Sequence, residues 1–230
     1  MRIILAIVLA LAVASWAFTG EESASAAYGW KVDADYPVAG IQEIDAELRE
    51  WLGEHIRRNV ADFAGVVIEP EFPQDNWWMG VGYEVSRPSD RAVSYIFTTI
   101  LSPEKAAHPM TLVDVLSFDV ASGKRLAFGD VFARPETALE IMSEHAQRLV
   151  KERLIKEHPD TAEYLGDDMW FKEGFEAKLD NFDAFVLEPG GVRVVFQRYQ
   201  VLAYVFGNPE VFFPLELLEA AGPNLTYWEK

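Results

Sequence analysis

The residues best suited to catalysis do not fall into a known catalytic or metal-binding spacing. The chain has four histidines and no cysteine, which excludes disulfides, thiolate zinc sites and cysteine nucleophiles. No two histidines are four residues apart, so the H-E-x-x-H zinc motif is absent. There is also no G-x-S-x-G nucleophile turn, phosphate-binding loop or dinucleotide fingerprint. We therefore predict that the protein is not an enzyme and uses no metal and no cofactor.

His108, which precedes Pro109, is the histidine that we keep as a candidate site residue. One hypothesis is a hydrolase in which His108 acts with a nearby carboxylate, although no nucleophile, base and orienting group can be identified together. The alternative is that His108 caps a loop through a hydrogen bond. His55 and His145 fall at the margins of amphipathic patterns, where we expect partly exposed or core-edge side chains.

Acidic residues outnumber basic residues by 37 to 20, and the formal net charge is −17. This excess argues against nucleic-acid binding, because phosphate contacts need clustered lysine and arginine. It can steer basic partners towards the protein. The acidic stretch 167–183 lacks the spacing of a calcium-binding loop, so we interpret it as solvated charge.

The adjacent pair Trp77-Trp78 is the sharpest candidate for a binding surface. Neighbouring residues on a strand point to opposite faces of the sheet. One indole can therefore enter the core while the other faces a partner, since exposed aromatic side chains stack on sugars and anchor protein interfaces. The alternative is that both indoles are buried, one under a helix and one under a loop.

The first 26 residues have the pattern of a secretory signal peptide. Arg2 is followed by an apolar run over residues 3–18, and Ala24-Ser25-Ala26 fits a cleavage site. The run is shorter than the roughly 20 residues that span a bilayer, although an uncleaved anchor stays an alternative. We expect residues 27–230 to form the mature, exported protein, periplasmic or extracellular, with no transmembrane helix after the signal peptide is removed.

Two long segments have the spacing of amphipathic helices, and the remaining patterned segments favour strands. Apolar residues recur every three or four positions over 41–65 and over 135–158. Strands are expected at 30–37, 77–87, 92–102, 111–120, 184–188 and 192–199, with short helices at 160–165 and 215–221 and an amphipathic segment at 167–183. The predicted fold class is α+β: an antiparallel sheet packed against two main helices in a single compact domain.

The stretch RYQVLAYVFGNPEVFFP, residues 198–214, contains five aromatic residues around a turn signal. We expect it to supply two further strands joined by a turn at Gly207-Asn208, with the aromatic side chains facing the core.

Two stretches together resemble a known family. These are residues 106–132, AAHPMTLVDVLSFDVASGKRLAFGDVF, and residues 181–218, which run from Asn181-Phe182 to the end of LELL. They are similar to the extracellular domain shared by RsiV-type lysozyme-sensing anti-sigma factors and the non-catalytic part of PdaC-type peptidoglycan deacetylases. The resemblance covers about residues 36–218. The matching signature residues are Asp119, Gly123, Lys124, Asp130, Phe132, Tyr199 and Gly207, which we expect to be structural.

The resemblance implies the binding half of such proteins, because the chain has neither a sigma-binding segment nor a deacetylase domain. We therefore expect an exported, non-catalytic binding domain of the cell envelope. The candidate partner-binding residues are Trp77, Trp78 and His108. The candidate partners are a basic protein such as a lysozyme-like wall hydrolase or, as an alternative, a peptidoglycan glycan. A structural assembly protein, marked by a large apolar surface patch, is a further alternative.

Overall fold

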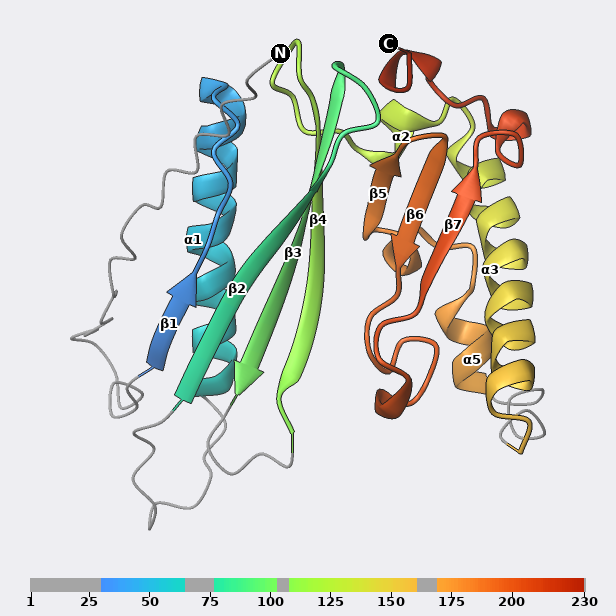
Figure 1. The fold of residues 1–230 in the computed structure, drawn as a ribbon, viewed down its shortest axis with the longest axis horizontal. Helices are drawn as coiled ribbons and strands as arrows, with labels where there is room; N and C mark the ends of the chain where they lie inside the picture. The colour runs from blue at the N-terminus through green and yellow to red at the C-terminus, as the bar shows by residue number, and fades with distance from the viewer. Residues whose placement is uncertain (1–29, 65–76, 103–107, 161–168, 230) are drawn as a thin grey trace, which may run out of the picture.

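The computed structural model describes residues 30–64, 77–102, 108–160 and 169–229. It contains two sheets, each covered on its outer face by a helix (Figure 1). The strands and helices are β1 (Trp30–Ala34), α1 (Gln42–Ala64), β2 (Trp77–Ser86), β3 (Ala92–Ser102), β4 (Met110–Asp119), α2 (Phe128–Val131), α3 (Pro135–Glu157), α5 (Met169–Gly174), β5 (Phe185–Glu188), β6 (Gly191–Val195) and β7 (Glu210–Pro214). Short 3₁₀ helices η1–η4 lie at Leu179–Asn181, Tyr204–Phe206, Glu219–Ala221 and Leu225–Tyr227.

The first sheet has the strand order β1-β2-β3-β4 and packs against α1. Ile44, Leu48 and Leu52 recur every four residues along α1 and are buried against this sheet, as their helical spacing predicts. They meet Met79 and Phe97, among other residues of the same sheet face. The first core is therefore a helix packed on one face of a sheet.

The second sheet has the order β5-β6-β7 and packs against α3 and α5. Phe182, Phe196 and Phe213 are fully buried in this second core. The 23-residue helix α3 contributes the stripe Ala138, Leu139, Met142, Ala146, Val150 and Leu154. Pro135 begins α3, where a missing N–H costs little. The two predicted main helices are thus confirmed.

The two sheets face each other, and a small apolar cluster joins them near one end. Ile96 and Val113 of the first sheet pack against Val186 and Val195 of the second. The backbone N–H of Leu187 donates to Ser94 Oγ at 3.0 Å. In β3, residues up to Phe97 are buried, whereas Thr98 and Ile100 are exposed. The face of the first sheet that points towards the second sheet, its inner face, is therefore covered only along the first half of β3. We call the rest of this face, which carries Thr98 and Ile100, the open half-face.

The α+β prediction is confirmed, but the arrangement of the strands differs from the single antiparallel sheet that we expected. The strands divide between two sheets, and β1 pairs with β2 in parallel. The predicted terminal helix at 215–221 is a run of turns followed by the 3₁₀ helix η3. The signal-peptide prediction and most of the predicted helix at 160–165 lie outside the described residues. None of the described helices is long and apolar enough to cross a bilayer.

The prediction for residues 198–214 is wrong in its first half. The chain leaves β6 at Val195, turns at Gln197–Gln200 and forms η2 before Glu210 begins β7. Phe213 faces the core as expected, but Tyr199 is 44% exposed and Phe212 is 41% exposed. Gly207 does form a turn, with a φ of 71° at the end of η2. The strand-like composition is overridden here by hydrogen bonds from glutamine side chains, described below.

Candidate functional site

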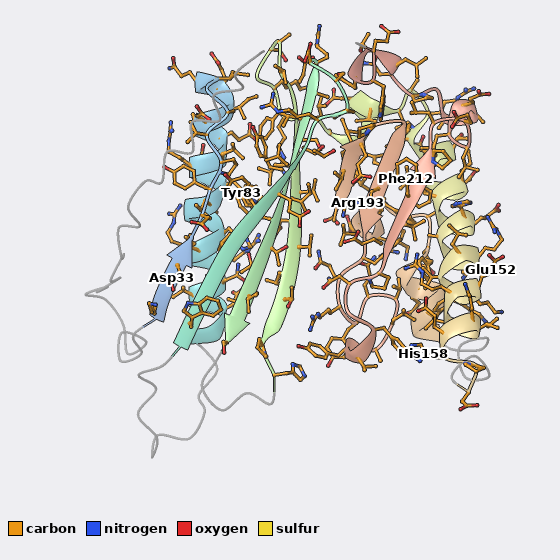
Figure 2. The ribbon with its side chains drawn as sticks, viewed as in Figure 1. Asp33, Tyr83, Glu152, His158, Arg193 and Phe212 are labelled. Carbon is orange, nitrogen blue, oxygen red and sulfur yellow. The ribbon has the colours of Figure 1, made fainter. Side chains whose placement is uncertain are left out.

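Trp78 lies on the open half-face and covers Gly80. A Cβ atom added at Gly80 would come within 2.4 Å of Trp78 Cη2. The indole therefore lies against the glycine backbone, two residues further along the same strand and on the same face. Its Nε1 donates to Asp33 Oδ2 of β1 at 2.7 Å, and Figure 2 shows Asp33 at that end of the sheet. The indole is half-buried and held in one orientation, which makes it a preorganised aromatic surface.

The carboxylate that holds Trp78 is itself held by two partners. The hydrogen bond from Trp78, and then that from Lys31 at 3.0 Å, keep the pKa of Asp33 below its ordinary value. Asp33 is therefore ionised at neutral pH and remains an acceptor for the indole N–H. Trp77 begins β2 opposite Trp30, but its side chain lies outside the described part of the structure.

The surface next to Trp78 carries few charges. Gly80 pairs with Ile100 and Gly82 pairs with Thr98 across β2 and β3, so these four residues share the inner face. Thr98 and Ile100 are exposed. Glu84, two residues beyond Gly82, adds an exposed carboxylate on the same row of β2. The open half-face thus offers an indole, two glycines, a threonine and an isoleucine, with the Lys31–Asp33 ion pair and Glu84 at its margins.

His108 does not form a catalytic pair within the described structure. Its ring stacks on Tyr204, with 3.7 Å between ring centroids and 24° between planes. Its Nδ1 lies 3.2 Å from the Pro109 carbonyl oxygen, and Tyr204 donates its hydroxyl to the same oxygen at 2.7 Å. No described carboxylate contacts His108. The loop-capping interpretation fits these contacts, and the contacts that a hydrolase would need are not among them.

The signature residues around residues 119–132 stabilise turns. Asp119 Oδ1 accepts the N–H groups of Ala121 and Ser122 at 2.9 and 3.1 Å, while both carboxylate oxygens accept from Arg91 at 3.0 Å. Gly123 has a φ of 70°, and a Cβ there would meet Glu43 of α1 at 2.6 Å. These contacts stabilise the turn that follows β4 and place it against α1.

The next signature residues complete the same corner. Lys124 Nζ donates to Asp130 Oδ1 at 2.8 Å, and Asp130 Oδ2 accepts the Ala127 N–H at 2.8 Å, which caps α2. Phe132 is buried and forms a bridge to Pro223. All five residues of this corner have structural contacts, as we expected. Tyr199 and Gly207 lie at a different end of the fold.

A buried histidine network was missed by the sequence analysis. His55, expected at a helix margin, is only 2% exposed. Its Nε2 lies 2.8 Å from Thr99 Oγ1, and its Nδ1 lies 3.7 Å from Asp114 Oδ2. Trp51 stacks on its ring at 4.8 Å. A hydroxyl, an imidazole and a carboxylate in this order resemble a catalytic triad, but Thr99 is fully buried against α1, so no substrate reaches its hydroxyl.

We expect His55 to make the protein less stable in mild acid. Burial, aided by Arg58 and opposed by Asp114, lowers the pKa of His55 below 6.5. The unfolded chain therefore binds a proton at His55 at a higher pH than the folded chain does, so stability falls as the pH drops below about 6.5. Urea unfolding at pH 7.5 and pH 5.5 should show this loss, and His55→Gln should reduce it.

His145 is the control for this measurement, because burial and Arg148 also lower its pKa. His145→Gln should remove a smaller part of the pH dependence, since this side chain is only half-buried. An unchanged pH dependence in His55→Gln would show that His55 does not stay neutral in the fold.

Part of the chain matches a known family model. Residues 129–216 match the family model described as a protein of unknown function, DUF3298. The matched region contains α3, the second sheet and the turn that carries Tyr199. No curated protein matches the chain.

Two crystal structures have a similar fold. One is a DUF3298 family protein from Pseudomonas aeruginosa PAO1, with 18% identity, a TM-score of 0.55 and coverage of 83% of each chain. The other is a member of the same family from Bacteroides fragilis NCTC 9343, with 14% identity, a TM-score of 0.53 and coverage of 87% of each chain. Both comparisons cover more than four fifths of the chain, so they support one shared fold for most of it.

The described residues contain no group of three or more histidine, cysteine, aspartate or glutamate side chains placed to hold a metal ion. The candidate site described above is a surface of aromatic and small residues, which can take part in stacking, hydrogen bonds and charge interactions.

Proposed function

We propose that the protein is an exported, non-catalytic binding domain of the cell envelope and that the open half-face is its binding surface. The observation that carries the proposal is Trp78, an indole fixed over Gly80 by Asp33. A preorganised aromatic side chain loses little conformational entropy on binding and serves as an anchor. Export, with residues 1–26 removed, is part of the proposal, and N-terminal sequencing of the secreted protein tests it.

We propose a basic, lysozyme-like wall hydrolase as the partner. The net charge of −17 favours attraction of a basic protein. Glu84 places an exposed carboxylate at the margin of the Trp78 surface, where it can meet lysine or arginine. Asp33 is already paired with Lys31 and supports the indole instead. The resemblance to the extracellular domain of lysozyme-sensing anti-sigma factors supports the same partner.

A glycan is the second candidate, and one observation favours it. Gly82 and Thr98, which pair across β2 and β3 next to the indole-covered Gly80, carry no charge. Sugar rings stack on such aromatic surfaces, and threonine hydroxyls hydrogen-bond to their hydroxyl groups. Glycan fragments are therefore the ligands to test if lysozyme does not bind.

Trp78→Ala should weaken lysozyme binding at least tenfold, because an interface anchor contributes on the order of 2 kcal/mol. The measurement is calorimetric titration of residues 27–230 with a basic lysozyme at low and physiological salt. Tyr83→Ala is the matched control: Tyr83 is an exposed aromatic residue of the same strand, at a register position on the opposite sheet face. It should leave the affinity unchanged.

Binding that disappears at physiological salt would show nonspecific charge attraction, and the lysozyme proposal would then be abandoned. Equal losses in Trp78→Ala and Tyr83→Ala would exclude the open half-face as the binding surface. Asp33→Asn separates the charge of Asp33 from its hydrogen bond with the indole. The substitution removes the charge, while the amide oxygen can still accept from the indole N–H.

A further inference from the structure

The strand β1 covers only the first half of the edge of β2. Its five residues pair with residues 77–81, and the last backbone bond of this pairing runs from the Asp35 N–H to the Val81 carbonyl oxygen at 2.9 Å. Beyond this point β2 continues without β1 (Figure 1). Alternate residues of a strand direct their backbone groups to the same side, so those of Tyr83 and Val85 point to the uncovered side. Within the described residues nothing hydrogen-bonds to these groups, and we call residues 83–85 the free edge of β2.

Two edges of the second sheet have backbone groups that are occupied by side chains. On β5, the Leu187 N–H donates to Ser94 Oγ at 3.0 Å, and the Leu187 carbonyl oxygen accepts from Ser86 Oγ at 2.8 Å. On β7, the Glu210 carbonyl oxygen accepts from Arg153 at 3.5 Å. The free edge of β2 differs from both, because its N–H and C=O groups are available to an extended chain.

The side chains along the free edge are apolar on one face and acidic on the other. Tyr83 is 40% exposed and Val85 is 46% exposed, and both lie on the face that packs against α1 (Figure 2). Glu84 is exposed on the inner face, and Asp35 is exposed just beyond the end of β1. Neither carboxylate has an ion-pair partner in the described part of the chain. The free edge therefore fits a strand that alternates apolar and positively charged side chains.

A second copy of this chain does not have that pattern. If two copies paired in antiparallel fashion about the middle of the free edge, each Glu84 would lie opposite its own copy. Like charges directly opposite one another destabilise a strand pair, and each chain carries a net charge of −17, so the two copies repel. The free edge thus favours a basic partner of a different sequence.

We propose that the free edge of β2 binds an extended basic peptide segment by strand addition. The apolar residues of the segment lie beside Tyr83 and Val85, and its lysine or arginine faces Glu84. In this mode of recognition the main-chain hydrogen bonds give affinity and the alternate side chains give specificity. Tyr83 and Val85 lie on the sheet face opposite Trp78, and Glu84 borders both surfaces. The site is distinct from the Trp78 surface, so it goes beyond the function proposed above.

The probe is the peptide acetyl-Lys-Val-Lys-Val-Lys-amide, titrated into the protein and followed by NMR. The backbone amide signals of Tyr83 and Val85 should shift most. The peptide acetyl-Lys-Lys-Lys-Val-Val-amide has the same composition and charge without the alternation, and it should bind about threefold more weakly or worse. Equal binding of the two peptides would show charge attraction alone and would overturn the proposal.

Backbone methylation of the probe separates strand addition from side-chain contacts. In antiparallel pairing both valine N–H groups of the probe face the free edge, whereas its lysine N–H groups face away. Methylating the two valine nitrogens should weaken binding about tenfold or more, and methylating two lysine nitrogens should change it less than about twofold. The reverse result supports an added strand in parallel pairing. Equal effects of the two methylations contradict strand addition.

Protein variants locate the site. Glu84→Gln should weaken probe binding about threefold, as the loss of an exposed charge pair does. Glu140→Gln removes an exposed carboxylate from α3 and should leave binding unchanged, so equal losses in these two variants would exclude the free edge. Trp78→Ala should also leave probe binding unchanged, and failure of this proposal is therefore distinguishable from failure of the Trp78 surface.

Discussion

Replacing Gly174 with alanine is expected to destabilise the protein by about 3 kcal/mol, at the upper end of the cost of overpacking. Gly174 ends α5, and a Cβ there would lie 2.0 Å from the Gln200 carbonyl oxygen and 2.8 Å from Val201 Cγ1. The first neighbour is backbone, so the clash cannot be relieved by a side-chain rotation. The loss of unfolding free energy is measured by urea unfolding of the variant and of the original protein. Both curves are fitted with the same dependence of the free energy on urea concentration.

Gly53→Ala is the matched control for this substitution. Gly53 lies within α1, and nothing lies within 4 Å of a Cβ built there. Alanine should stabilise this helix by about 0.5–1 kcal/mol. If Gly174→Ala were as stable as the original protein, the turn at Gln200 would be free to move away from α5, and the hydrogen bond from Gln200 Nε2 to the Gly174 carbonyl oxygen would not hold it there.

Asp119→Ala is expected to cost about 3 kcal/mol, because it removes at once the hydrogen-bonded partner of a charge and the acceptor of two turn N–H groups. Asp119 is 7% exposed, and its carboxylate accepts hydrogen bonds from Arg91, Ala121 and Ser122. Burial acts to raise the pKa of Asp119, but the hydrogen bonds from Arg91, Ser122 and Ala121 outweigh it and hold the pKa below its ordinary value.

The pH dependence of this loss follows from that lowered pKa. The stabilisation by Asp119 is complete above the unfolded pKa of about 3.9 and is lost as the pH falls through the lower, folded pKa. The difference in unfolding free energy between Asp119→Ala and the original protein should therefore be full at pH 6 and should shrink in strong acid. A difference that stayed constant down to pH 2 would show that the carboxylate charge contributes nothing.

One further variant separates the contributions of Asp119, and a second tests the neighbouring ion pair of Asp130. Asp119→Asn keeps an acceptor for the turn N–H groups but loses the ion pair, so it should cost less than alanine. Asp130→Ala removes the more exposed pair with Lys124 and one cap of α2, for which we expect about 1 kcal/mol.

The long helices were predictable because their pattern repeats many times. In α1 and α3 the apolar residues recur over 23 residues each, and no local alternative competes with such a stripe. Strand alternation also predicted opposite faces for Trp77 and Trp78, and of these two side chains the structure describes Trp78. A further signal was available: a glycine two residues after Trp78 lies beside it on the same face, which indicates a close approach to Gly80.

Other features depend on contacts between distant parts of the chain. The burial of His55 depends on Thr99, which is 44 residues away. The turn at Tyr199 depends on Gln197 bonding Val113, 84 residues away. The aromatic composition of 198–206 favours a strand, but these side-chain hydrogen bonds form only once both sheets are in place. The residue pattern within 198–206 does not predict these hydrogen bonds.

The hydrogen bonds of Gln197 also bear on aggregation. An exposed edge strand offers a row of free N–H and C=O groups to which another chain can add. On β4, Gln197 occupies both backbone groups of Val113, and the segment around Arg125 bridges Phe118 and accompanies the strand near its end. These contacts interrupt the row of backbone groups that β4 would otherwise present along its ten residues. A second molecule therefore meets an edge strand whose hydrogen-bonding groups are partly occupied by one glutamine side chain and one returning turn.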